Sequence, residues 1–173
     1  GRGAGYTGTR AVRYGCDLSF YRPDPTGPDD YVLYLGRPHA HKGIELIVSI
    51  AEMLPSTRFV CAWRPAGQDH RDSATAFARR VVSLSNVEIV TLPADPTEHH
   101  ARKRDLLAKA RVAFHPATYL DACPRTVIEA QACGVPVVAF ARGGVPELVY
   151  PGRTAALAPF PIGYPGQGGT VDA

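Results

Sequence analysis

Short apolar runs alternate with longer, partly apolar segments along the middle of the chain. Residues 31–35 (YVLYL) are apolar at every position, whereas apolar side chains in residues 42–54 recur at roughly helical spacing. The first pattern is typical of strands buried on both faces and the second of amphipathic helices. The pattern predicts strands over residues 31–35, 58–63, 87–92, 111–115 and 135–141, and a short strand over 154–158. It predicts helices over residues 42–54, 69–84, 98–110 and 124–133, and one helical turn over 145–149.

The alternation of strands and helices predicts the fold class. Strands that alternate with helices form βαβ units and a parallel sheet. Strands that are apolar throughout indicate helices on both faces of that sheet. We therefore expect an α/β fold with a doubly wound, Rossmann-like parallel sheet. Ligands of such sheets bind beyond the carboxyl ends of the strands, which directs the search to the loops 36–43, 63–68, 92–97, 116–124 and 141–146.

Length and composition agree with one globular domain. The chain has 173 residues, of which 45% are hydrophobic and 20% charged, as in ordinary folded proteins. A net charge of +3 gives no case for a nucleic-acid partner. No apolar run approaches the roughly 20 residues of a membrane span, and the N-terminus lacks a signal-peptide core. Because glycine and proline concentrate at both ends, we expect flexible tails over residues 1–10 and 159–173 around a domain over residues 11–158.

The cysteines do not form a recognisable metal or disulfide motif. Cys16, Cys61, Cys123 and Cys133 include no Cys-x-x-Cys pair and no cluster with zinc spacing. We expect reduced, mostly buried thiols in a cytoplasmic protein.

A glycine-rich motif near the N-terminus is a poor candidate for a phosphate loop. Residues 3–8 (GAGYTG) match G-x-G-x-x-G, but such a loop needs a strand directly before it and a helix directly after it. Only two residues precede this motif, so we interpret it as part of the flexible tail and not as a dinucleotide site.

The loop after the first predicted strand carries two cations. Arg37 and Lys42 flank a turn at a helix start, behind Gly36. Backbone N–H groups at a helix start favour an anion, and an arginine fork with a lysine point charge is a sensible diphosphate clamp. Solvated loop charges are the alternative, and the same alternative applies to His39 and His41 beside them.

The loop after the fourth predicted strand carries two carboxylates. Asp121 precedes a helix and Glu129 lies inside it, in a segment that should be largely buried. A buried carboxylate needs partners, which sugar or ribose hydroxyls would supply; an internal salt bridge is the alternative. His115, at the strand end, is interpreted as a packed strand residue. The paired glycines Gly143-Gly144 allow either close approach by a ligand or a tight turn.

Taken in order, these motifs resemble a known family. The segments G-R-x4-K-G at residues 36–43, D-x7-E-A-Q-A-C-G-V-P-V at 121–137 and G-G-V-P-E at 143–147 resemble the C-terminal, donor-binding domain of retaining GT-B glycosyltransferases of family 4 (glycosyl transferases group 1). The segment 14–23 resembles the interdomain connector of these enzymes. The resemblance covers roughly residues 12–158.

The resemblance implies a role for each matching residue. Arg37 and Lys42 would hold the diphosphate of a nucleotide sugar, Glu129 would hydrogen-bond the ribose, and Asp121 would contact sugar hydroxyls. The implied catalytic residues are these four. The implied donor-binding residues are Gly36, Arg37, Lys42, Leu92, Pro93, Asp121, Pro124, Arg125, Thr126, Val127 and Glu129. Asp121 departs from the family, which has Glu there, and residues 63–67 (WRPAG) replace the usual glycine pair.

The implied reaction is transfer of a hexose to an acceptor hydroxyl with retention of configuration. The diphosphate clamp requires no metal or other cofactor, and the sequence has no Asp-x-Asp pair. The family binds the acceptor on an N-terminal domain, which we expect to be a missing partner, so the chain alone would be inactive. A non-catalytic nucleotide-binding or assembly module and a GT-B nucleotide-sugar epimerase remain as alternatives. The basic stretch 102–104 is interpreted as a solvated helix face, and nothing indicates peripheral membrane association.

Overall fold

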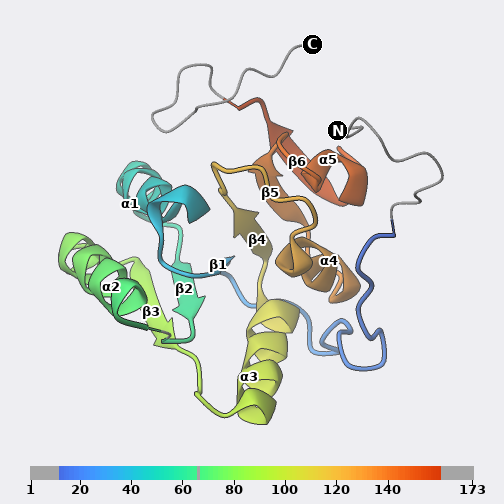
Figure 1. Ribbon diagram of the computed structural model, residues 1–173, viewed down its shortest axis with the longest axis horizontal. Coiled ribbons are helices and arrows are strands. Elements are labelled where there is room, and N and C mark those ends of the chain that lie inside the picture. Colours follow the sequence, from blue (N-terminus) through green and yellow to red (C-terminus); the bar gives the residue numbers. More distant parts are fainter. Residues whose placement is uncertain (1–11, 66, 161–173) are drawn as a thin grey trace, which may run out of the picture.

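The computed structural model describes residues 12–65 and 67–160, and in this part of the chain six strands form one parallel sheet. The strand order is β3-β2-β1-β4-β5-β6 (Figure 1). The strands are β1 (Val32–Leu35), β2 (Phe59–Trp63), β3 (Val87–Thr91), β4 (Val112–His115), β5 (Val137–Phe140) and β6 (Ala155–Ala158). The predicted α/β fold with a doubly wound parallel sheet is confirmed.

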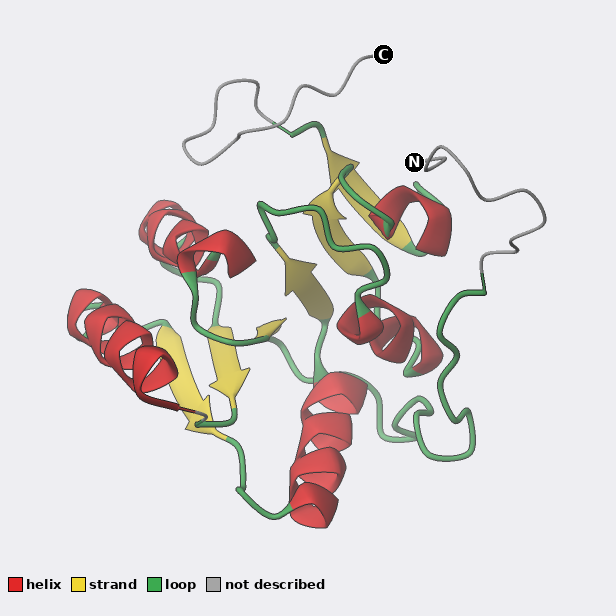
Figure 2. Ribbon diagram, in the orientation of Figure 1, coloured by secondary structure: helices red, strands yellow, loops and turns green. Residues whose placement is uncertain are grey.

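Helices cover both faces of this sheet, as Figure 2 shows. Side chains alternate between the faces, so that Leu33 belongs to the core beneath α3, α4 and α5 whereas Tyr34 belongs to the core beneath α1 and α2. All residues of β2 are buried, which explains why its sequence is apolar throughout. The helices are η1 (Ala40–Lys42), α1 (Ile44–Met53), α2 (Gly67–Val81), α3 (Pro96–Lys109), α4 (Arg125–Ala132) and α5 (Val145–Leu148).

The helix predicted over residues 42–54 is divided in two. Gly43 has a φ of 76°, in the left-handed region, and separates the 3-10 turn η1 from α1. Helical periodicity does not detect this break because Ile44 and the residues after it keep the apolar face of α1. The break turns Lys42 away from the axis of α1, toward the loop after β4.

The order of the strands places the functional loops. The chain runs outward from β1 to β3, then crosses back to β4 beside β1 and continues to β6. The loops after β1 and β4 therefore leave adjacent strands in opposite directions, which is the topological switch point where ligands of such sheets bind. The two loops are joined directly, since the Thr118 N–H donates to the His41 carbonyl at 2.9 Å.

Two glycines allow the main chains of neighbouring loops to pack in direct contact near the switch point. A Cβ on Gly43 would lie 1.9 Å from the carbonyl oxygen of Pro116, and one on Gly144 would lie 1.9 Å from that of Ala122. The N–H of Gly144 donates to the carbonyl of Asp121 at 2.8 Å. Gly143 and Gly144 thus serve close backbone packing against the loop around Asp121, a role that the sequence did not indicate.

Some of the predictions made from the sequence concern residues that the structure does not describe. The glycine-rich motif at 3–8 and the predicted tails, apart from residues 159 and 160, lie outside them. Among the helices of the described segments, none has the length and apolar character needed to cross a membrane.

We predict that Gly144→Ala destabilises the fold by about 2 kcal/mol or more, because the new methyl group meets a carbonyl oxygen that cannot move without shifting the Asp121 loop. Gly15→Ala is the matched control, since its Cβ meets nothing within 4 Å. Urea denaturation should show a change for Gly15→Ala below about 0.5 kcal/mol. Equal stability of the two variants would contradict the close packing described for Gly144.

Candidate functional site

A cleft of about 860 Å³ opens beyond the carboxyl ends of β1, β2 and β4. Its size is in the range of small-molecule sites. It is lined by most of the predicted donor-binding residues: Gly36, Arg37, Lys42, Leu92, Asp121, Pro124, Arg125 and Thr126. Pro93, Val127 and Glu129 do not line it.

The loop after β1 is held in place from below. The hydroxyl of the buried Tyr34 donates to the Arg37 carbonyl at 2.8 Å, and the His39 N–H donates to the same carbonyl at 2.8 Å. Because both donors fix one carbonyl, the main chain around Arg37 is anchored to the sheet before any ligand binds. Arg37 and Lys42 then reach the cleft from the two ends of one short, ordered turn.

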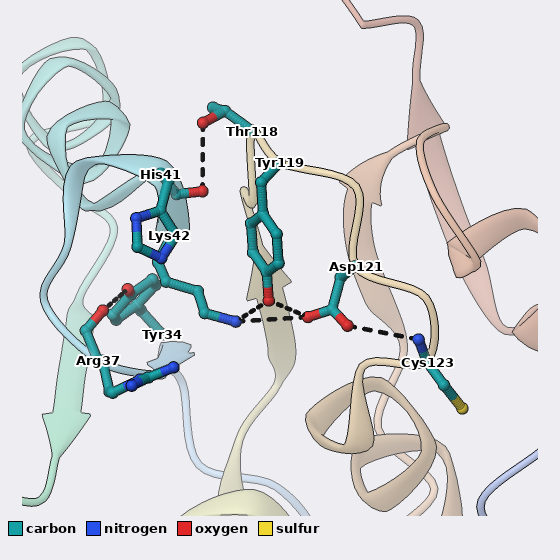
Figure 3. A network of polar contacts seen from close by, with 8 residues as sticks. All are labelled: Tyr34, Arg37, His41, Lys42, Thr118, Tyr119, Asp121 and Cys123. Atoms are coloured by element: carbon teal, nitrogen blue, oxygen red, sulfur yellow. Dashed lines mark hydrogen bonds and ion pairs between the residues drawn. The ribbon is translucent and has the colours of Figure 1, made fainter. Parts of the chain in front are cut away.

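Lys42 and Asp121 meet across the switch point through Tyr119 (Figure 3). The Lys42 ammonium donates to the Tyr119 hydroxyl and lies 3.4 Å from Asp121 Oδ2, and the hydroxyl donates to the same carboxylate. The Cys123 N–H lies 3.4 Å from the other oxygen of Asp121. A cation and an acid predicted to act on the donor therefore form one network. Tyr119 was not predicted as a site residue. The only indication in the sequence was its position in the candidate loop 116–124.

Burial and charge shift the pKa values of this network. Burial lowers the pKa of Lys42, against the opposing influence of the Asp121 carboxylate. Burial acts to raise the pKa of Asp121, but the hydrogen bond from Tyr119 and the charge of Lys42 outweigh it, so the pKa is lowered. Burial, followed by the bond to Asp121, raises the pKa of the Tyr119 hydroxyl. The Tyr119 hydroxyl therefore lies between the Lys42 nitrogen and the Asp121 carboxylate.

His115 ends β4 as predicted, and it also lines the cleft. Its Nε2 is buried and has no hydrogen-bond partner in the described structure. Burial, with the nearby charge of Lys42, lowers its pKa to about 4, and Asp121 offsets part of that shift. The imidazole is therefore neutral at physiological pH.

Glu129 forms an internal ion pair. Its Oε2 lies 2.5 Å from the Nζ of Lys103, and both side chains are almost fully buried. Lys103 lines the cleft and Glu129 does not. The carboxylate therefore contacts a residue of the cleft wall without being part of that wall itself. The interpretation of residues 102–104 as a solvated face is wrong for Lys103, because α3 packs this residue against α4 and the acid there.

The far wall of the cleft was largely missed in the sequence. Trp63 ends β2 and Arg64 follows it, whereas His99 and His100 lie in the first half of α3. Burial lowers the pKa of His99, and its neighbour His100 lowers it further. The loop 63–68 was a candidate by position alone, whereas no pattern in α3 indicates that its histidines face a cleft.

Metal ligands do not converge anywhere in residues 12–65 and 67–160: no group of three or more His, Cys, Asp or Glu side chains there is arranged to hold an ion. The four cysteines are free thiols, with Cys61 and Cys133 buried.

The family model described as glycosyl transferases group 1 matches residues 29–161. The D-inositol 3-phosphate glycosyltransferase of Mycobacteroides abscessus is 34% identical over 131 residues, which cover 76% of this chain and 29% of that protein. The enzyme of the same name from Mycobacterium bovis (strain BCG / Pasteur 1173P2) is 31% identical over 156 residues, covering 84% and 32%. The chain thus spans about a third of the length of these relatives.

Solved structures share the fold. Anabaena Alr3699/HepE in complex with UDP-glucose aligns with a TM-score of 0.69 at 22% identity, over 84% of this chain and 42% of that one. The C-terminal domain of LpcC, a glycosyl transferase group 1 family protein from Francisella tularensis, aligns with a TM-score of 0.62 at 17% identity, over 84% and 80%. The described fold is therefore that of the C-terminal half of GT-B proteins.

We predict that Lys103→Met costs about 3–5 kcal/mol of stability, because it leaves the buried Glu129 carboxylate without its cation. The double variant Lys103→Met with Glu129→Leu should recover most of this loss, since no buried charge remains. Urea denaturation of the three chains tests the pair. A single-variant cost below about 1 kcal/mol would contradict a buried ion pair.

We also predict an acid-dependent loss of stability that depends on His115. The unfolded chain protonates this imidazole near its ordinary pKa of 6.5 and the folded chain only near pH 4, so the unfolded state binds more protons between these values. The free energy of unfolding should fall by about 2 kcal/mol between pH 7 and pH 5 on account of this group.

His115→Phe provides the comparison for this pH dependence. The pKa values of His39, His41 and His99 are also lowered, but these residues are present in both chains. The difference between the two urea denaturation series therefore isolates His115. If the free energy of unfolding of the two chains had the same pH dependence, His115 would have the same pKa in the folded and unfolded states, which would contradict the prediction.

Proposed function

The chain belongs to the glycosyl transferases group 1 family, and on that premise we propose that it is the donor-binding domain of a retaining glycosyltransferase that transfers a hexose from a nucleoside diphosphate to an acceptor hydroxyl. The observation that carries the proposal is the convergence of Arg37, Lys42 and Asp121 with the start of α4 in one cleft. Anions favour such a combination of cations and helical N–H groups.

The diphosphate would lie between the loop after β1 and the start of α4. Arg37 offers a forked contact and Lys42 a point charge. The N–H groups of Arg125 and Thr126 lie in the first turn of α4, where no intrahelical acceptor is available to them. The Val127 N–H instead donates to the Pro124 carbonyl at 3.1 Å, so a phosphate contact there would replace that bond.

The sugar and the nucleoside would occupy opposite ends of the cleft. Asp121 borders the position next to Lys42 and would accept hydrogen bonds from sugar hydroxyls. Leu92 lines the cleft near Trp63, on the side that we propose for the base. A ribose contact by Glu129 would require this acid to exchange Lys103 for the ligand, because the pair is closed in the described structure.

The chemistry that we propose is electrostatic. As the bond between the anomeric carbon and the diphosphate breaks, negative charge develops on the leaving phosphate. A new bond forms from the acceptor oxygen to that carbon, on the face that the diphosphate leaves, and the acceptor's proton passes to an oxygen of the leaving phosphate. Arg37 and the start of α4 line the cleft in which this charge would develop, and Lys42 would exchange its contacts with Tyr119 and Asp121 for it. These groups neutralise the phosphates without a metal ion in the proposed mechanism.

The acceptor site belongs to a different domain in this proposal. The chain spans about a third of the length of its curated relatives, and no residue of its cleft is assigned to an acceptor in this proposal. We propose that this domain transfers no sugar without an N-terminal acceptor-binding domain. The free thiols agree with a reducing compartment, and we propose a cytoplasmic location.

We predict that the chain binds at least one of UDP, GDP and ADP, and that Arg37→Ala with Lys42→Ala weakens that binding at least roughly tenfold by removing two charge-assisted contacts. Arg79→Ala with Arg153→Ala is the matched control, because it removes the same charge from exposed positions outside the cleft.

Calorimetric or NMR-detected titrations of the three chains measure these affinities. If the wild-type chain bound none of the three nucleotides, the alternative of a non-catalytic assembly module with the same fold would be favoured. Equal effects of the two double variants would place the binding outside the proposed clamp.

A further inference from the structure

Arg64 is a cleft residue to which the proposed function assigns no task. It follows Trp63, the last residue of β2, and it is an exposed residue that lines the cleft. It belongs to the segment 63–67, in which the sequence departs from the glycine pair that the resemblance leads us to expect. In the described part of the chain no hydrogen bond or ion pair holds its guanidinium. The N–H donors of this group are therefore available to a ligand.

The register of the sheet places Arg64 beside Arg37. β1 and β2 are neighbours in the sheet (Figure 1), with Leu35 paired to Ala62, and the Gly36 N–H donates to the Ala62 carbonyl at 3.2 Å. Arg37 and Arg64 each lie two residues beyond that pair. Since neighbouring strands are roughly 4.8 Å apart, the two arginines enter the cleft from adjacent strand ends.

The register also places Arg64 beside the loop after β3. Trp63 is paired to Thr91, and the Leu92 N–H donates to the Trp63 carbonyl at 2.8 Å. Leu92 lines the cleft on the side that we propose for the base. Arg64 therefore lies between the proposed base side and the proposed diphosphate clamp.

The charges of the cleft favour an anion at this position. The two lysines that line the cleft are each paired with an acid. Arg37 and Arg64 also line it, but neither forms an ion pair with an acid of residues 12–65 and 67–160. Two like charges on adjacent strand ends repel each other, and an anion that contacts both offsets this repulsion.

The order of the strand ends decides which part of the donor meets Arg64. In a nucleoside diphosphate, the ribose and the first phosphate lie between the base and the second phosphate. Of these two groups only the phosphate is charged, and the arginine fork matches its oxygens. A ribose hydroxyl would leave the charge of Arg64 without a counterion.

We infer that Arg64 binds the phosphate attached to the ribose of the donor, while Arg37 and Lys42 hold the second phosphate, which carries the sugar; this inference rests on the proposed function. The loop after β2 is then a third part of the phosphate site, in addition to the loop after β1 and the start of α4. Because the leaving-group charge develops on the second phosphate, the main contribution of Arg64 is to affinity for the nucleotide.

The test compares a nucleoside with its monophosphate and its diphosphate. Uridine, UMP and UDP, together with the guanosine and adenosine series, are titrated by NMR into the wild-type chain. The series with the tightest diphosphate is then titrated into Arg64→Ala, Arg64→Lys and Arg37→Ala. The matched control is Arg79→Ala, which removes the same charge from an exposed position of α2 outside the cleft.

We expect the wild-type chain to bind the monophosphate more tightly than the nucleoside. Arg64→Ala should weaken binding of the monophosphate and of the diphosphate by the same factor, roughly tenfold, because both ligands carry the first phosphate. Arg37→Ala should weaken binding of the diphosphate more than that of the monophosphate. The affinities of Arg64→Lys should fall between those of wild type and Arg64→Ala, since lysine returns the charge without the fork. Arg79→Ala should change each affinity less than about twofold.

Several results would overturn this inference while leaving the proposed function intact. One is a wild-type chain that binds the diphosphate but binds the monophosphate no better than the nucleoside. Others are an effect of Arg64→Ala on the diphosphate alone, an equal effect on the nucleoside, no effect, or an effect no larger than that of Arg79→Ala. If the wild-type chain bound no nucleotide, the proposed function and this inference would both be overturned.

Discussion

Main-chain contacts among three loops are the constraint on which the cleft depends. Gly43 lies against the carbonyl of Pro116 and Gly144 against that of Ala122, at distances that leave no room for a Cβ. Lys42 precedes the first contact and Asp121 is held by the second. The loops after β1, β4 and β5 are therefore fixed to one another by their backbones, and the distance between the cation and the acid follows from that packing.

Two of the cations that line the cleft, Lys42 and Lys103, are each paired with an acid. Lys42 is paired with Asp121 at the cleft's rim and Lys103 with Glu129 in the interior, and in each pair one partner lies on a loop or helix remote in sequence from the other. Pairing lowers the cost of burying these charges. It also means that a ligand for any of these four residues enters as a competitor for an existing contact.

The regular elements could be predicted from the sequence because their signals are local. The apolar runs that became β1 to β5 and the periodicity of α1 reflect burial within single segments. The interior of the site depends instead on contacts between distant segments. Nothing near Lys103 in the sequence indicates that Glu129 would be its partner. The burial of Nε2 of His115 and the backbone role of Gly144 likewise follow from tertiary packing.

Under the proposed function, the ion pair between Lys103 and Glu129 would affect the rate at which nucleotides exchange. A ribose that takes over the carboxylate gains its hydrogen bonds but loses the interaction between acid and lysine, so part of the gross binding free energy is cancelled. The returning ammonium group would in turn compete with the nucleotide for Glu129 and shorten its residence time. In an enzyme whose spent nucleoside diphosphate must leave before the next donor arrives, such an internal competitor favours rapid exchange of product for substrate over tight binding.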